Sequence, residues 1–137
     1  MCIRDRIKDQ DIPGCIAELG VFQGDTAAVL NALFPDRELY LFDTFDGFQS
    51  EDVETEQSEG FSDASIQDFS CTSGKKVLKK MPFPEKTTIK EGRFPETAEG
   101  LSTLRYAMVS LDADLYEPTF TGLSYFYPCL LYTSRCV

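Results

Sequence analysis

Asp112 and Asp114 are the side chains of this chain best placed by sequence to do chemistry, because they directly follow an apolar run in VSLDADLYEP. Side chains two residues apart on an extended strand point the same way, so both carboxylates are expected to face one crevice. Two neighbouring desolvated carboxylates are unfavourable unless a cation or a shared proton compensates for them. Oxygen-only ligands favour Mg²⁺ or Mn²⁺ over zinc. The alternative is a purely structural role, in which the two aspartates form a solvated strand end that caps the next helix.

The chain contains no histidine among its 137 residues. A serine-histidine-aspartate triad and histidine metal ligands are therefore excluded within it. Any proton-accepting side chain must be a carboxylate, lysine, tyrosine or cysteine. The absence of histidine makes the two aspartates stronger candidates for a catalytic role.

A second group of acids surrounds a glycine turn in ELGVFQGD, which begins at Glu18. Asp43 follows Gly20 by 23 residues, where a nucleotide-binding fold places a ribose-binding acid. A dinucleotide pyrophosphate favours GxGxxG, but Phe22 occupies the second glycine position and the flanking acids would repel phosphate. The turn suits a cofactor with an ammonium and a sulfonium, such as S-adenosylmethionine. Alternatively, the glycines only form a tight turn that Asp25 caps.

The elements that carry these residues alternate between strand and helix patterns. Short apolar runs predict strands at residues 15–21, 38–43, 87–92 and 106–111. Helical patterns occupy residues 26–34, 73–81, 95–101 and 118–126. A strand, helix and strand within about 30 residues form a βαβ unit with parallel strands. We therefore expect a parallel α/β sheet with its ligand site at the carboxyl ends of the strands.

The stretch 44–74 carries eight acidic residues and neither lysine nor arginine. With its glycines and serines, it predicts a mobile loop over the strand ends, with a lid as one role. The following KKVLKK predicts a short helix with solvated lysines, which Thr72 is expected to cap.

Composition excludes several classes of partner. A net charge of -10 argues against a nucleic-acid surface, which is usually basic. No apolar run is long enough to span a bilayer, and the N-terminus lacks the apolar core of a signal peptide. The five scattered cysteines include no CxxC pair and are expected to be reduced thiols. These features predict a cytoplasmic protein without membrane or nucleic-acid partners.

Four segments in this order resemble the macrocin O-methyltransferase family: IPGCIAELGVFQGDTA, LYLFDTFDGF, IKEGRFPETAEGL and VSLDADLYEPT. The similarity spans residues 12–128. It implies a Rossmann-like methyltransferase sheet with flanking helices, S-adenosylmethionine as methyl donor, and Mg²⁺-assisted transfer to a sugar or glycan hydroxyl. The expected acceptor is a small molecule or glycan that carries such a hydroxyl.

The resemblance also implies roles for individual residues. Asp112 would be a metal ligand and Asp114 the catalytic general base that takes the hydroxyl proton. Phe45 and Phe94, just past strand ends, are the candidates to flank an adenine or substrate ring. The residues expected to contact the cofactor are Glu18, Gly20, Asp43, Thr44, Phe45, Gly92 and Phe94.

Only the first four strands of the family's sheet are expected in this chain, as a partial methyltransferase domain at 12–128. Residues 1–11 and 129–137 fit neither the motif pattern nor its composition, and are expected to be non-native, the first segment non-native or disordered. Further metal ligands would lie beyond the chain, so metal affinity is expected to fall steeply, and whether this fragment is active or inactive stays open. An exposed strand edge invites pairing with another chain, which leaves a homo-oligomer open.

Two other function classes remain as alternatives. Nucleotide-sugar glycosyltransferases also place Asp-x-Asp after an apolar strand, where the pair holds Mn²⁺ on a diphosphate. A noncatalytic fragment that keeps part of the cofactor cleft is the second. A dehydrogenase is disfavoured by the glycine spacing and the acidic turn.

Overall fold

Four parallel strands form one sheet in a computed structural model of the chain, which describes residues 3–65 and 72–131. The strands are β1 (Cys15–Leu19), β2 (Leu39–Asp43), β3 (Thr87–Glu91) and β4 (Tyr106–Leu111). Their order is β3-β2-β1-β4, so β1 pairs with both β2 and β4. The predicted parallel α/β sheet is confirmed, with each strand at its predicted place.

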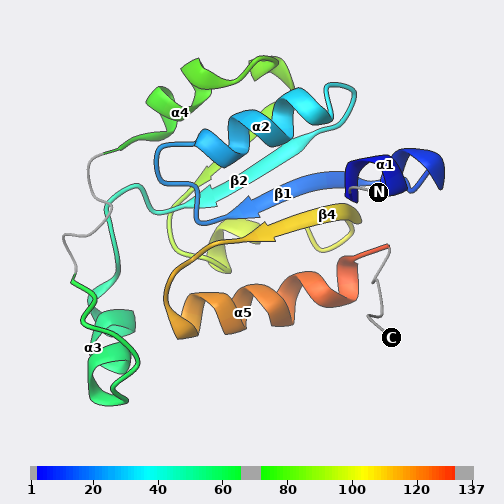
Figure 1. Cartoon of the computed structure of the whole chain (residues 1–137). Helices are drawn as coiled ribbons and strands as arrows, with labels where there is room; N and C mark the ends of the chain where they lie inside the picture. The colour runs from blue at the N-terminus through cyan, green and yellow to red at the C-terminus, as the bar shows by residue number, and fades with distance from the viewer. Residues whose placement is uncertain (1–2, 66–71, 132–137) are drawn as a thin grey trace.

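Helices cover both faces of this sheet (Figure 1). Helices α2 (Asp25–Leu33) and α4 (Gly74–Lys80) lie on one face, and α5 (Tyr116–Phe126) lies on the other. The chain adds β2 and β3 on one side of β1 and then returns to place β4 on the opposite side. The strand order therefore reverses between β1 and β4, which is where open α/β sheets bind ligands.

Each face of the sheet has its own apolar core, because successive side chains of a strand point to opposite faces. The cluster on the α2 face contains Ile16, Leu41 and Val77, all at most 1% exposed. The cluster on the α5 face contains Phe42 and Phe126, also at most 1% exposed. Burial of each such side chain contributes about 1.5–3 kcal/mol, so these clusters fix the strand ends.

Helix α3 (Ser50–Ser58) differs from the expectation of a loop. It lies at the carboxyl end of the sheet, near the start of α5 (Figure 1). Its buried residues are Asp52, Val53 and Glu56, two of which are acidic. The helix thus lacks an apolar stripe, the signal by which periodicity identifies helices. Residues 66–71 of the predicted loop lie outside the described residues.

Both ends of the chain take more part in the fold than expected. Residues 1–11 were expected as a non-native or disordered end, yet helix α1 (Ile3–Asp9) buries Ile7 in the α2-side core at 2% exposure. At the other end, Leu130 forms a parallel bridge with Tyr106, within the expected tail 129–137. Residues 132–137 lie outside the described part of the chain. Across residues 3–65 and 72–131, the structure contains no helix with the length and apolar character of a membrane span.

Ser73, rather than the predicted Thr72, caps α4. Its hydroxyl oxygen accepts a hydrogen bond from the Lys76 N–H at 3.4 Å. Thr72 instead donates to the Phe22 carbonyl at 2.7 Å, which ties the start of α4 to the turn after β1. The predicted short helix with solvated lysines is confirmed in α4, since its four lysines are exposed and Val77 is fully buried.

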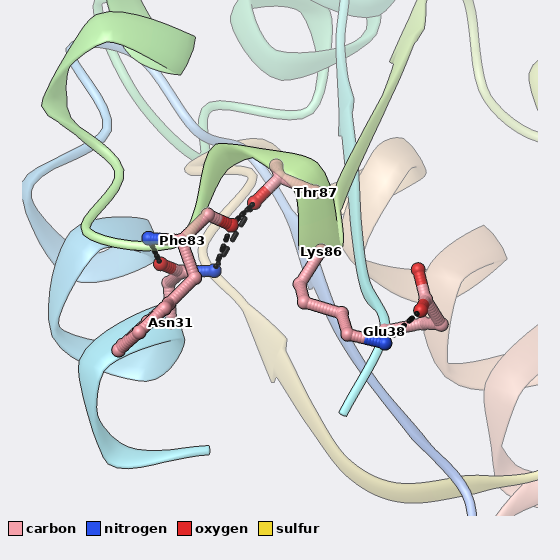
Figure 2. Close-up of polar contacts among 5 residues, drawn as sticks. All are labelled: Asn31, Glu38, Phe83, Lys86 and Thr87. Carbon is pink, nitrogen blue, oxygen red and sulfur yellow. Dashed lines mark hydrogen bonds and ion pairs between the residues drawn. The ribbon is translucent and has the colours of Figure 1, made fainter. Parts of the chain in front are cut away.

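Asn31 joins α2 to the segment that leads into β3 (Figure 2). Its side chain is 1% exposed. The amide oxygen accepts from the Phe83 N–H at 2.6 Å, and the amide nitrogen donates to the Phe83 carbonyl and to Thr87 Oγ1, each at 3.1 Å. Beside this contact, Lys86 pairs with Glu38 at 3.0 Å, where both side chains are more than a third exposed.

We expect Asn31→Ala to lower the free energy of unfolding by about 2–3 kcal/mol, because it removes the three hydrogen bonds of a buried side chain. Urea denaturation monitored by circular dichroism would measure this loss. Lys86→Ala is the matched control, because it removes only the exposed neighbouring ion pair. Its denaturation midpoint should stay unchanged. Equal midpoints for the two variants would show that the Asn31 contact is not structural.

Candidate active site

The carboxyl ends of the four strands are drawn together by backbone hydrogen bonds beyond their last pairings. These bonds, each 2.9–3.0 Å long, join Gly20 to Phe42, Asp112 to Leu19, and Gly92 to Asp43. As a result, the four segments that carry the candidate residues meet at one edge of the sheet.

Gly20 permits the closest of these approaches. Its φ of +85° lies in the left-handed region, which favours glycine. A Cβ atom at this position would stand 2.0 Å from the carbonyl oxygen of Asp112. The glycine therefore lets the turn after β1 lie directly against the segment that carries Asp112 and Asp114.

Asp43 organises the same turn through its carboxylate. One oxygen accepts from the Val21 N–H at 2.6 Å and the Phe22 N–H at 2.8 Å, and the other accepts from the Phe45 N–H at 2.7 Å. A carboxylate has about four acceptor positions, so roughly one remains for a ligand hydroxyl. Sequence reasoning placed Asp43 at the cleft but did not anticipate this structural role.

Two adjoining pockets open at this edge and share Gly20, Phe22, Asp112 and Asp114. The first, here called the aromatic pocket, also has Phe42 and Phe94 in its wall, together with Asp43. The second, here called the acidic pocket, adds Glu18 and Asp25. The cleft thus combines an apolar part with an acid-lined part.

Six of the seven residues predicted to contact a cofactor line these two pockets: Glu18, Gly20, Asp43, Thr44, Gly92 and Phe94. Phe45 is the exception. Its ring is 3% exposed and packs in the α2-side core, so the prediction that it flanks a ligand ring is wrong. Phe94 does reach the aromatic pocket, and its ring stacks on Phe126 at 5.3 Å between centroids.

Glu18 is the most unusual residue of the site. Its side chain is 1% exposed, and its Oε2 has no hydrogen-bond partner within residues 3–65 and 72–131. Burial, followed by the nearby carboxylates of Asp112 and Asp43, raises the pKa of Glu18 to about 8. A buried carboxyl that lines a pocket without a partner calls for a cationic or hydrogen-bond-donating ligand.

Asp112 and Asp114 stand where the two pockets meet, and both are exposed. They do not extend from one strand as predicted, because β4 ends at Leu111 and Asp114 has a left-handed φ of +60°. Both nevertheless reach the same cleft. Partial burial, followed by the charge of Asp112, raises the pKa of Asp114.

The predicted Mg²⁺ site is not complete in this part of the chain. Within the described ranges, no group of three or more cysteine or acidic residues is arranged to hold a metal ion. Asp112 therefore has no converging set of partner ligands there, and the residues present do not fit a metal-ion site on their own.

Arg93 joins α3 to this cleft. Its guanidinium pairs with Glu51 at 2.5 Å and with Asp52 at 3.1 Å. The carboxylate of Glu56 accepts a hydrogen bond from the Tyr116 N–H at the start of α5. Asp52 also lines the aromatic pocket, so α3 supplies one wall of the cleft. Sequence reasoning missed this wall because α3 itself was expected as a loop.

The parallel sheet, its reversal of strand order and the cleft at that point define a Rossmann-like α/β domain. The chain belongs to the Macrocin-O-methyltransferase (TylF) family, whose family model matches residues 1–133. This match begins before, and ends after, the span 12–128 expected from the motifs. A comparison with curated proteins gave no match. Membership indicates an O-methyltransferase, a kind of enzyme that in general uses S-adenosylmethionine.

Proposed function

We propose that this protein binds S-adenosylmethionine in the cleft between β1 and β4 and directs its methyl group to a hydroxyl of a sugar or glycan acceptor. The observation that carries the proposal is Glu18. This carboxyl is buried beside Asp112 and Asp43, has an unpartnered oxygen and lines an acid-walled pocket. Family membership supports the same activity.

The two pockets suit different parts of the S-adenosylmethionine molecule. The acidic pocket suits a group that carries ammonium and sulfonium charges, because the Glu18 carboxyl there is unpartnered, whereas Asp25 pairs with Lys80 at 2.8 Å. The aromatic pocket suits an adenosine group, since Phe94 supplies a ring and Asp43 retains acceptor capacity for a hydroxyl. S-adenosylmethionine supplies an electrophilic methyl group on its sulfonium.

Asp114 is the residue that we propose as general base. It is exposed at the junction of the pockets, where an acceptor hydroxyl can reach it. Burial and the adjacent Asp112 raise its pKa, which makes the carboxylate a better proton acceptor. We include no metal-dependent step, because the described carboxylates do not make up a metal site.

The same observations disfavour a nucleotide-sugar glycosyltransferase. That chemistry needs a metal ion to hold a diphosphate next to Asp-x-Asp, whereas the carboxylates of the acidic pocket have no completing ligand set among the residues that the structure describes. Without the cation, these carboxylates would repel the diphosphate.

Isothermal titration calorimetry with S-adenosylmethionine, S-adenosylhomocysteine and NAD tests the proposal. We expect saturable binding of the first two and none of NAD. Glu18→Gln should weaken S-adenosylmethionine at least about tenfold, since a charged hydrogen bond contributes about 1.5–3 kcal/mol. Glu99→Gln, an exposed acid outside both pockets, should bind like the wild type. A folded chain that binds neither methionine-derived ligand, or binds NAD equally well, would contradict the proposal.

A further inference from the structure

Helix α5 has a second apolar face in addition to the one that packs on the sheet. Gly122 and Phe126 form the inner face, where a Cβ atom on Gly122 would lie 2.6 Å from Leu19. The outer face is exposed and apolar. Here called the outer stripe, it consists of Tyr116 (50% exposed), Phe120 (55%), Leu123 (50%), Tyr127 (63%) and Leu131 (44%).

The outer stripe is continuous rather than scattered. Within α5 its residues recur at intervals of four and three, which places them on one side of a helix. The rings of Tyr116 and Phe120 are stacked, 6.0 Å apart and 11° from parallel. Phe61, itself 56% exposed, extends the stripe with a ring 5.3 Å from that of Tyr116. Contiguous exposed apolar surface of this kind marks an interaction site.

Charge indicates what can cover the outer stripe. Residues 118–131 contain no aspartate, glutamate, lysine or arginine. The acids gather at the start of the helix, where Glu117 lies and where Glu56 of α3 reaches Tyr116. An uncharged stripe without basic residues does not suit an anionic membrane surface, which needs lysine or arginine on the helix. It also gives a basic protein partner nothing to pair with along most of its length.

A second copy of this chain supplies an uncharged apolar partner surface, and it fits when the two α5 helices are antiparallel. The net charge of -10 makes two copies repel each other, and a parallel arrangement would bring their two acidic ends together. An antiparallel arrangement places the acidic start of each α5 beside the uncharged end of the other. It also opposes the two helix dipoles favourably.

We propose that two copies associate through their outer stripes, with α5 packed antiparallel to α5 of the partner about a two-fold axis. Such an interface is isologous, so the same patch serves both copies. The axis passes near the middle of the stripe, between Phe120 and Leu123. This proposal does not depend on the proposed methyl transfer.

Sedimentation equilibrium over a range of protein concentrations tests the association. We expect a dimer for the wild type and at least a tenfold larger dissociation constant for Leu123→Glu. Val29→Glu is the matched control, because Val29 is a similarly exposed apolar residue, at 57%, on α2 across the sheet. It should dimerise like the wild type. Circular dichroism melting would verify that both variants remain folded.

The orientation has its own test. Leu123→Cys should form an intermolecular disulfide under mild oxidation, identified by mass spectrometry of the linked peptide. Tyr116→Cys should not, because antiparallel packing separates the two copies of this position by about 16 Å along the helix axes at 1.5 Å per residue. A wild-type monomer at high concentration would overturn the proposal. A dimer that survives Leu123→Glu would also overturn it. Equal effects of Leu123→Glu and Val29→Glu, or cross-linking through Tyr116→Cys alone, would overturn it as well.

Discussion

Gly20→Ala is expected to lower the free energy of unfolding by about 2–5 kcal/mol. The new Cβ atom would lie 2.0 Å from the oxygen and 2.5 Å from the carbon of the Asp112 carbonyl. Overpacking of this kind costs about 1–3 kcal/mol. The left-handed φ of +85° adds about 1–2 kcal/mol for any residue with a side chain. Because the obstructing atoms belong to the backbone, no side-chain rotation relieves the clash. Urea denaturation would measure the loss.

Gly100→Ala separates the two contributions. Gly100 has a similar φ of +80°, but a Cβ atom there would meet nothing within 4 Å. This variant should lose only about 1–2 kcal/mol from the backbone conformation. If both alanine variants were equally stable, the turn after β1 would not lie against Asp112, and the cleft described between these segments would be wrong.

Glu18→Gln is expected to change how stability depends on pH. The carboxyl has an ordinary pKa of 4.5, and the folded protein raises the pKa to about 8. Between these values the folded state holds a proton that the unfolded state has released, so stability falls as the pH rises. The slope for one proton is at most about 1.4 kcal/mol per pH unit. Glutamine carries no such proton, so this part of the slope should disappear.

Urea denaturation between pH 5 and pH 9 would measure both curves. Glu18→Gln should be clearly more stable than the wild type near pH 9, where the wild type contains a buried carboxylate. At pH 5, where the wild-type carboxyl is protonated when folded, the two should differ little. Glu99→Gln, at an exposed position, should follow the wild-type curve. Parallel curves for Glu18→Gln and wild type would mean that Glu18 is not buried uncharged.

The same residue connects stability with ligand binding. A cationic ligand in the acidic pocket stabilises the carboxylate form, so binding at pH 7 should release a proton from Glu18. Calorimetry in buffers with different ionisation enthalpies detects that release. The stability penalty above pH 8 and the proposed donor site thus have one physical cause.

The sheet was predictable because its strands are short apolar runs that end in glycines or acids at the spacing of βαβ units. Its ligand edge followed from the same pattern, since Asp43, Gly92 and Asp112 stand at or just past strand ends. Helix α3 was not predictable in this way. Acidic side chains attach α3 to Arg93 and to the start of α5. Such long-range contacts produce no periodic pattern in the sequence.

The sequence predicted which residues form the site, but it predicted less well how buried each one is and which groups surround it. Sequence position cannot distinguish a ring that faces a cleft from one that faces the core, and Phe45 faces the core while Phe94 reaches the cleft. Asp43 was expected at the cleft, but two of its three bonds to backbone N–H groups depend on the shape of a turn 21 and 22 residues away. Likewise, the raised pKa of Glu18 arises first from its burial and then from its neighbours in space, Asp112 and Asp43.

The attachment of α3 by carboxylates has a consequence for the energetics of the cleft. Val53 is the only apolar residue that this helix buries. Local opening is least costly where little apolar surface is uncovered, so α3 can detach while both cores of the sheet stay intact. The two walls of the aromatic pocket therefore differ in kind. We expect the wall of strand ends to unfold only with the domain, and the α3 wall to open locally at a lower free-energy cost.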